Sequence, residues 1–410
     1  MGLYAEYLGK GLGANPVALT AERKKQLAAI AKVRERDVLV YAVDVNKGKS
    51  QININYSDLL PFTDQLSDLN GTRIDLILET PGGSGEAAED IVKLLHGKYE
   101  EVNVIIPGMA KSAGTLIAMA GDDILMESMS SLGPIDAQMM WQGKQFSAHA
   151  LIEGVEKIKK EVLSTGSLNR AYVPILQNIS PGELQHAENA LDFASDLVTE
   201  WLATYKFKNW KTHSSTGAPV TDDERKVRAK EIAAQLRDHS RWKTHGRSLK
   251  IEDLEQMRLR VTDYSKIPEL AEAIRRYYTL LQMTFASNIY KLFETPGSQI
   301  LRMDVQRAPN VFGPGVQLPG GAQPQAMAAM EAEVACAKCG TKFVVQGRVD
   351  PRVPPTPGAI QMPADSLIKC PGPNCQEIHD LKALRKDIET ATGRQIIAPP
   401  TPVQPKKVMP

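Results

Sequence analysis

The sequence predicts an α/β fold with a parallel sheet, followed by a small metal-binding module on a flexible linker. Two observations predict the sheet: residues 74–78 and 102–106 are short, nearly continuous runs of Ile, Val and Leu, and each precedes a glycine-rich turn and an apolar helix. Such successive strand–helix units imply right-handed crossovers. A third observation, four cysteines grouped after residue 335, predicts the metal-binding module.

Composition excludes several classes of protein. The chain has 410 residues, a formal net charge of +1 and an apolar fraction of 42%. Its overall charge therefore gives no reason to expect nucleic-acid binding. It lacks an apolar run of about 18 residues, so no membrane span is expected. The N-terminus has neither the basic start nor the apolar core of a secretion signal. We therefore expect a soluble, cytoplasmic protein.

Changes in composition predict five segments along the chain. Within the first, a basic helix from Thr20 to about Arg34 is expected to expose its charges to solvent. The linker and the tail are rich in proline, and the linker also in glycine. The expected segments are an N-terminal arm and helix (1–34), the main α/β domain (35–303), the linker (304–334), the cysteine module (335–397) and a disordered tail (398–410).

Two neighbouring turns are candidates for a catalytic site. The first strand ends in Pro81–Gly83 and the second leads to Lys111–Gly114. Ligand sites of α/β units lie at the carboxyl ends of the strands, so Gly83 and Ser112 should face each other across one crevice. A serine beside free backbone N–H groups has the setting of a nucleophile next to an oxyanion hole. The alternative for Ser112 is an ordinary helix N-cap.

Four motifs follow one another in a specific order and spacing: Thr80–Gly83, Lys111–Gly114, Ala118–Ile124 and Ser131–Asp136. With them, the stretch 75–138 resembles the Clp protease and crotonase superfamily, most of all the branch with signal peptide peptidase A and the serine dehydrogenase proteinases. The resemblance covers roughly residues 35–300. It implies a spiral of ββα units, a homo-oligomer and serine peptidase activity.

The resemblance also implies roles for individual residues. Ser112 is the nucleophile, and the backbone N–H groups of Gly83 and Ala113 form the oxyanion hole. Glycine at position 83 allows the backbone to approach a substrate closely, and the Ala113 N–H lies where a helix dipole favours negative charge. Gly82 and Gly85 are expected to bind substrate.

The general base is not specified by the motifs. Clp-type members use a histidine at the end of the strand that follows the nucleophile helix, but residues 130–138 contain none, and Asp136 is the nearest titratable group. Signal peptide peptidases use a lysine, and Arg170 stands in the corresponding region. An arginine does not deprotonate at usable pH, so a Ser–Lys dyad does not carry across directly.

Several candidates for the base remain open. We predict Lys160 as the base; a lysine acts this way only if burial lowers its pKa. Asp136 is predicted as a further catalytic residue, although a carboxylate of ordinary pKa accepts a proton only weakly and Asp136 could equally cap or orient its loop. His245 is predicted to be structural or substrate-lining. Lys111 adjoins Ser112, but neighbours at a helix start point in different directions. The remaining candidates are Lys157, Lys159, His149 and a residue from another subunit.

The four cysteines form two pairs. Cys336 and Cys339 make a C-x2-C turn followed by Gly340, and Cys370 and Cys375 make a C-x4-C pair. Four thiolates predict a closed, tetrahedral structural zinc site, and a segment this small needs the metal to fold. Because the module hangs from a linker, we hypothesise that it recruits a substrate or partner.

The leading functional prediction is a soluble serine peptidase that cleaves peptide or protein substrates through an acyl-enzyme on Ser112. A catalytically silent oligomeric scaffold, binding a partner through the zinc module, is the first competing hypothesis, and the absence of a histidine near residue 136 favours it. Crotonase-like acyl-CoA chemistry is the second. It uses the same oxyanion hole without needing Ser112, so the Lys111–Gly114 motif argues against it.

Overall fold

The computed structural model describes residues 2–47, 50–141, 144–213, 215–304, 329–392 and 394–399. The chain divides into two compact units, Met1–Asp304 and Val305–Pro410. Most of the expected linker and of the expected tail lies outside the described residues, at 305–328 and 400–410. The five expected segments therefore stay predictions.

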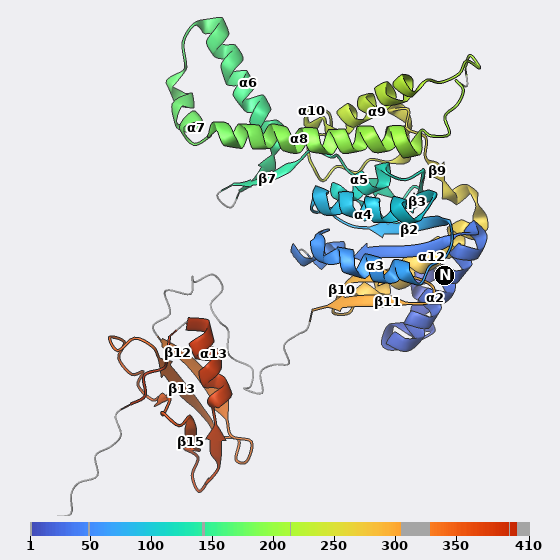
Figure 1. The fold of residues 1–410 in the computed structure, drawn as a ribbon. Coiled ribbons are helices and arrows are strands. Elements are labelled where there is room, and N and C mark those ends of the chain that lie inside the picture. The colour runs from blue at the N-terminus through green and yellow to red at the C-terminus, as the bar shows by residue number, and fades with distance from the viewer. Residues whose placement is uncertain are drawn as a thin grey trace, which may run out of the picture. The chain divides into compact units, whose positions relative to one another are not determined.

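A seven-stranded sheet forms the centre of the first unit (Figure 1). Its order is β11–β10–β1–β2–β3–β5–β9. Strands β1, β2, β3, β5 and β9 are parallel to one another, β10 pairs antiparallel with β1, and β11 pairs antiparallel with β10. The parallel α/β sheet predicted from the sequence is confirmed. The strands are Asp37–Val43 (β1), Arg73–Glu79 (β2), Glu101–Ile105 (β3), Asp123–Met126 (β5), Thr262–Asp263 (β9), Ile289–Glu294 (β10) and Gln299–Met303 (β11).

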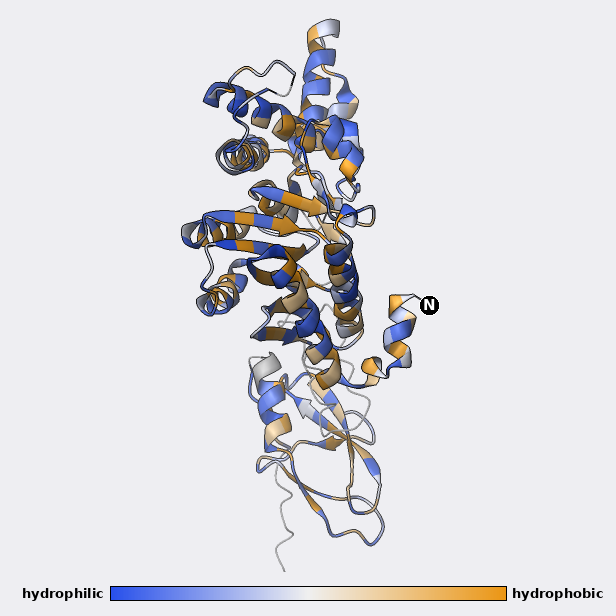
Figure 2. Cartoon of the chain, turned by 90° about the vertical axis from the view of Figure 1, so that its right-hand side faces the viewer, coloured by the Kyte–Doolittle hydropathy of each residue, from blue (hydrophilic) through white to orange (hydrophobic). Residues whose placement is uncertain are grey.

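Helices cover both faces of this sheet. Val38 and Val40 of β1 pack with α2 and α12, whereas Leu39 and Tyr41 belong to the core formed with α3, α4 and α5. Because both faces are buried, the strands are hydrophobic over much of their length (Figure 2). The covering helices are Pro16–Arg34 (α2), Leu59–Ser67 (α3), Gly85–Lys98 (α4), Ala113–Met119 (α5) and Pro268–Phe285 (α12).

Short extended segments pair with one another beyond the carboxyl ends of the main strands. They include β4 (Met109–Ala110) and β6 (Ser131–Leu132), which pair in parallel. A long strand, a short segment and a helix therefore recur along the chain, and this recurrence confirms the ββα organisation that the resemblance implies. The remaining bridges of this layer are Ile54–Gly83, Thr80–Ala110 and Leu132–Leu249.

The N-terminal helix differs from the prediction. Helix α2 begins at Pro16 rather than near Thr20, because the Asn15 side chain caps it by accepting a hydrogen bond from the Ala18 N–H at 3.0 Å. The charges are not all solvated: Arg23 is 1% exposed, and its guanidinium donates two hydrogen bonds of 2.8 Å to the Glu294 carboxylate. The expectation of a wholly solvated basic face was wrong. A short helix, Leu3–Gly9 (α1), precedes α2.

A helical extension follows β6 and returns over the sheet. Helices α6 (Ala148–Thr165) and α7 (Val173–Gln177) project away from the sheet, and α8 (Pro181–Trp201) packs against α5 (Figure 1). Among the described residues, no helix has the length and apolar character that a membrane span needs. The other elements of this part are Gln138–Trp141 (β7), Lys144–Ser147 (β8), Asp222–Arg237 (α9), His239–Trp242 (α10) and Ile251–Gln256 (α11).

The second unit has a small core of its own. Three strands form one sheet and two strands form another, and a C-terminal helix packs with them around buried side chains such as Val345, Met362 and Ile388. The elements are Ala329–Ala335 (β12), Lys342–Arg348 (β13), Ile360–Gln361 (β14), Leu367–Lys369 (β15), Ile378–Asp380 (β16) and Lys382–Thr392 (α13).

Candidate active site

Ser112 occupies a strained turn between β4 and α5. Its backbone has φ 49° and ψ −117°, a conformation that non-glycine residues rarely adopt and that clusters at functional sites. The turn is held on both sides, since the Lys111 N–H donates to the Thr80 carbonyl at 3.0 Å and the Thr115 N–H donates to the Ser112 carbonyl at 2.8 Å. The fold therefore maintains Ser112 in this geometry.

The glycine turn after β2 packs directly against Ser112. Gly82 and Gly83 have φ of 108° and 152°, which side chains rarely tolerate. A Cβ on Gly82 would lie 2.6 Å from the Cβ of Ser112, and a Cβ on Gly83 would lie 2.3 Å from the carbonyl oxygen of Ile54. Only glycine fits at these two positions. The structure thus brings together the two turns that the sequence singled out.

Two backbone N–H groups next to Ser112 are free to bind a ligand oxygen. The neighbours of Gly83 pair with Ile54, whose N–H donates to Gly82 O at 2.8 Å and whose carbonyl accepts from Ser84 N–H at 2.9 Å. In a parallel bridge of this kind, the N–H of Gly83 itself faces the opposite side. Among the described residues, neither this N–H nor that of Ala113 has a hydrogen-bond acceptor. This is the arrangement that an oxyanion hole requires.

These residues line one cavity of about 830 Å³. Gly82 and Gly85, which were predicted to bind substrate, and Ser112 lie in its wall. One face of α8 also lines the cavity, and the apolar part of the lining includes Leu116 and Ile135. The α8 residues recur at helical spacing: His186, Asn189, Ala190, Phe193 and Ala194.

Asp136 is buried behind this cavity between two histidines. Its Oδ1 lies 2.6 Å from Nδ1 of His245, and its Oδ2 lies 2.9 Å from Nδ1 of His239. The Gln138 amide also donates to Oδ2, at 3.1 Å. Burial by itself raises the pKa of Asp136, but the hydrogen bonds and charge of His245 and the hydrogen bond of His239 outweigh it and hold the pKa below its ordinary value. Asp136 is therefore an ionised carboxylate at neutral pH.

His245 is a candidate functional residue that the sequence prediction did not choose as the base. It lines the same cavity as Ser112 although it lies 109 residues after Asp136 in the chain. Its Nδ1 is taken by Asp136, which leaves Nε2 as the nitrogen available to the cavity. A sequence signal did exist, because His245 follows Trp242 in a polar turn that the resemblance includes. The sequence predicted a structural or substrate-lining role for His245, and it did not predict the pairing with Asp136.

Lys111 links the serine turn to the segment that follows His245. Its ammonium donates hydrogen bonds to the Leu132 carbonyl at 2.8 Å, the Arg247 carbonyl at 3.0 Å and the Ser248 hydroxyl at 3.0 Å. Burial lowers the pKa of Lys111 to about 8, and the nearby Lys250 adds to the effect. With three acceptors around it and no place in the cavity lining, Lys111 connects the two sides of the site and does not face the substrate.

The lysines predicted as bases lie on α6, outside the cavity lining. Lys160 is exposed. Lys157 pairs with Glu153 at 3.0 Å, and Lys159 pairs with Glu156 at 3.1 Å, as expected of a solvated helix face. His149 also lies outside the lining. Within one chain, the structure does not bring any of these candidates together with Ser112.

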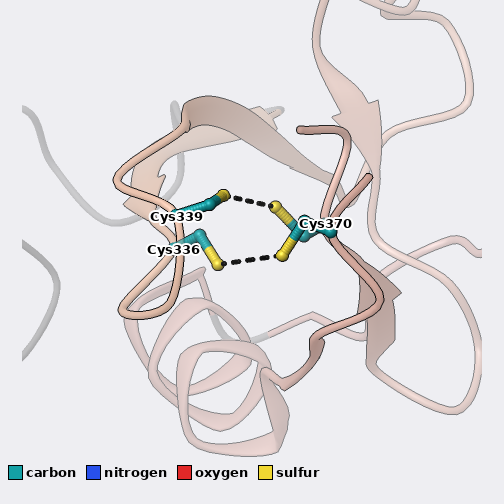
Figure 3. Close-up of side chains that lie close together, drawn as sticks. Cys336, Cys339 and Cys370 are labelled. Carbon is teal, nitrogen blue, oxygen red and sulfur yellow. Dashed lines mark hydrogen bonds between the residues drawn. The ribbon is translucent and has the colours of Figure 1, made fainter. Parts of the chain in front are cut away.

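The four cysteines of the second unit converge on one point. Figure 3 shows Cys336 and Cys339 on one turn facing the opposite pair. The sulfurs of Cys336 and Cys375 are 3.7 Å apart and those of Cys339 and Cys370 are 3.6 Å apart; all four lie within 4.8 Å of one another. A tetrahedral Zn–S site with bonds of about 2.3 Å has sulfurs about 3.8 Å apart. The donor set therefore fits a tetrahedral metal ion.

Comparison with protein families gives a match for the part of the chain that contains Ser112. Residues 64–181 match the ClpP-like SDH-type serine proteinase family. The resemblance seen in the sequence is confirmed. The matched span contains the glycine turn, Ser112 and Asp136, and it ends before His239 and His245.

Two curated relatives come from Methanocaldococcus jannaschii. The uncharacterized protein MJ0137 is 33% identical over 141 residues, covering 33% of this chain and 48% of the relative. The uncharacterized protein MJ1495 is 30% identical over 210 residues, covering 51% of this chain and 56% of the relative. The chain thus spans about half the length of the curated relatives that it matches.

Solved structures show weaker likenesses. A mutant of the 1510-N membrane-bound stomatin-specific protease has 23% identity and a TM-score of 0.21, covering 34% of this chain and 64% of that one. A second mutant of that protease, in complex with a substrate peptide, has 24% identity and a TM-score of 0.21, covering 26% of this chain and 54% of that one. Methylmalonyl CoA decarboxylase has 15% identity and a TM-score of 0.21, covering 50% of this chain and 87% of that one. Scores this low carry no argument about function.

Proposed function

We propose that this protein is a serine peptidase in which Ser112 is the nucleophile, His245 the general base and Asp136 the residue that orients the base. The observation that carries this proposal is the 2.6 Å pairing of Asp136 with a histidine that lines the same cavity as Ser112. The family match of residues 64–181 supports peptidase activity independently. The proposal gives the role of base, predicted for Lys160, to His245.

The arrangement supports acyl transfer in two steps. The Ser112 Oγ attacks the carbonyl carbon of a peptide bond while Nε2 of His245 takes its proton, and the oxyanion forms against the N–H groups of Gly83 and Ala113. The C–N bond then breaks, and the amine leaves with the proton from His245. Water, deprotonated by His245, hydrolyses the acyl-enzyme and regenerates Ser112. Asp136 stabilises the imidazolium that forms in both steps.

A fluorophosphonate probe tests the nucleophile. Wild-type protein should be labelled at one site, and Ser112→Ala should abolish labelling. Ser84→Ala is the matched control, because Ser84 lines the same cavity but caps α4 by accepting from the Ala87 N–H at 3.1 Å. A wild type that stays unlabelled would favour a scaffold or acyl-CoA function instead.

The same probe separates the two candidate bases. His245→Ala should remove nearly all labelling, whereas Lys160→Ala should label like wild type. Loss of labelling in Lys160→Ala but not in His245→Ala would show that Lys160 is the base and that a neighbouring subunit contributes it. A homo-oligomer, which the resemblance implies, would be seen directly by analytical ultracentrifugation of the same samples.

We also propose that the four-cysteine cluster holds a structural zinc ion. Bound by Cys336, Cys339, Cys370 and Cys375, the ion would cross-link two turns of a unit whose core is small. Elemental analysis should find one zinc per chain and none in Cys370→Ser.

We further propose that this unit recruits a protein substrate or partner. A chain lacking 305–410 that kept full activity on its physiological target would contradict that role.

A further inference from the structure

His239 contacts the second oxygen of the Asp136 carboxylate and does not line the cavity. Its Nδ1 is 2.9 Å from Oδ2 of Asp136, while Nδ1 of His245 is 2.6 Å from Oδ1. The Asp136 side chain has no exposed surface, and the side chain of His239 is 24% exposed. One buried carboxylate therefore accepts hydrogen bonds from two imidazoles, of which only His245 lines the cavity.

The two histidines stand at the two ends of one short segment, residues 239–245. The start of that segment is fixed, because the Asp238 side chain accepts from the Arg241 N–H at 3.1 Å and the Trp242 indole donates to the Gln235 carbonyl at 2.7 Å. Asp136 thus fastens both ends of the segment that carries His245. Loss of either bond would remove one of the two contacts that hold the carboxylate against this segment.

On the basis of the proposed serine peptidase function, we propose that His239 is a positioning residue, which holds the Asp136 carboxylate in the orientation that His245 requires. It acts through Asp136 and does not touch the substrate. Its effect is on the rate of acylation, because a base misplaced by about 1 Å can cost about 100-fold in rate.

Two substitutions at one position make the test. His239→Ala removes the hydrogen bond, whereas His239→Asn keeps an N–H donor near the position of Nδ1. Rates of fluorophosphonate labelling are measured at pH 8 for wild type, both variants and His149→Asn. Circular dichroism establishes that each variant is folded.

We expect His239→Ala to label roughly 10-fold more slowly than wild type at pH 8, and His239→Asn to recover most of the rate. His149→Asn should label at the rate of wild type. Equal losses in the two His239 variants, or wild-type rates in both, would overturn the inference and leave the proposed peptidase intact. An unlabelled wild type would overturn both.

Discussion

The two sides of the cavity are held by different kinds of contact. On the side of the proposed nucleophile (the nucleophile side), backbone contacts place Ser112, Gly82 and Gly83. On the side of the proposed base (the base side), side-chain hydrogen bonds place His245 and Asp136. The first side comes from two neighbouring βα turns that press against each other within van der Waals distance. The second side joins residues 109 positions apart through one carboxylate. Substitutions on the first side should therefore act through steric clash, whereas those on the second should act through charge, tautomer and pH.

The largest effect is expected on the base side, from Asp136→Asn. An asparagine can present an N–H to Nδ1 of His245 and favour the tautomer that cannot accept the serine proton. The rate of fluorophosphonate labelling should fall by about 10⁴-fold. Asp68→Asn, at an exposed position after α3, is the control and should label like wild type. A loss of less than about tenfold would show that Asp136 does not orient the base.

The corresponding test of the nucleophile side is Gly83→Ala. The new methyl group would meet the Ile54 backbone at 2.3 Å and push the Gly83 N–H out of place. Removal of one oxyanion donor typically costs about 100- to 1000-fold in rate, and we expect a loss in that range. Gly97→Ala in helix α4 is the control, since its Cβ meets nothing within 4 Å. Wild-type labelling in Gly83→Ala would remove Gly83 from the oxyanion hole.

A buried ion pair supports the nucleophile side from behind. Lys291 and Asp58 are both fully buried; the ammonium contacts both oxygens of the carboxylate at 2.9 and 3.0 Å and also donates to the Asn53 carbonyl at 2.9 Å. It thereby fixes the segment that bridges to Gly83. Breaking such a pair costs about 3 to 5 kcal/mol.

Lys291→Met should lower the free energy of unfolding of the first unit by about 3 kcal/mol, because Asp58 keeps Arg302 and Tyr41 as partners. Urea denaturation followed by tryptophan fluorescence measures the change. Lys266→Met is the surface control, as its side chain is 80% exposed, and the expected change is below about 1 kcal/mol. Similar changes in both variants would contradict a supporting role for the buried pair.

The smallest effect is expected from Glu79→Gln, next to the glycine turn. Burial raises the pKa of Glu79 from an ordinary 4.5 to about 7, although the Met109 N–H and the Tyr278 hydroxyl oppose the rise. The folded protein thus holds a proton that the unfolded chain has released. The contribution of protonated Glu79 to the free energy of unfolding is complete below pH 4.5 and is lost as pH rises towards 7, by at most about 3 kcal/mol.

Urea unfolding at several pH values between 4 and 8 checks this sign. Wild type should lose stability over that range, and Glu79→Gln, which cannot titrate, should lose less. Parallel curves for the two proteins would show that the pKa of Glu79 is the same in the folded and unfolded states, which would contradict the raised pKa. The result would also show whether the stability of the nucleophile side depends on pH.

The sequence predicted the strands and the two turns because their signals are local. Apolar runs buried on both faces predict parallel strands, and the spacing between Gly83 and Ser112 follows from one ββα repeat. His245 could not be assigned in the same way. Its role depends on a contact with Asp136 that the fold creates between distant segments, and a single sequence contains no record of that contact. Lys160 had a plausible position in the chain but lies on a solvated face.

Charged residues show the same limit elsewhere. Arg23 belongs to a helix with five basic residues, and nothing in their spacing distinguishes it from its solvated neighbours. Its burial follows from the position of Glu294 on β10, 271 residues later. The four cysteines were easier to predict, because each cysteine pair forms its own turn and four clustered thiolates are typical of a metal site.

Separate cores have a thermodynamic consequence for the whole chain. The sheet-centred unit is held by its own hydrophobic clusters, whereas the cysteine unit, with zinc bound as proposed, gains stability in proportion to the logarithm of the free zinc concentration. Heating should then give two unfolding transitions, and only the one from the cysteine unit should move when zinc is varied. No single melting temperature describes such a molecule, because its two units respond to different variables.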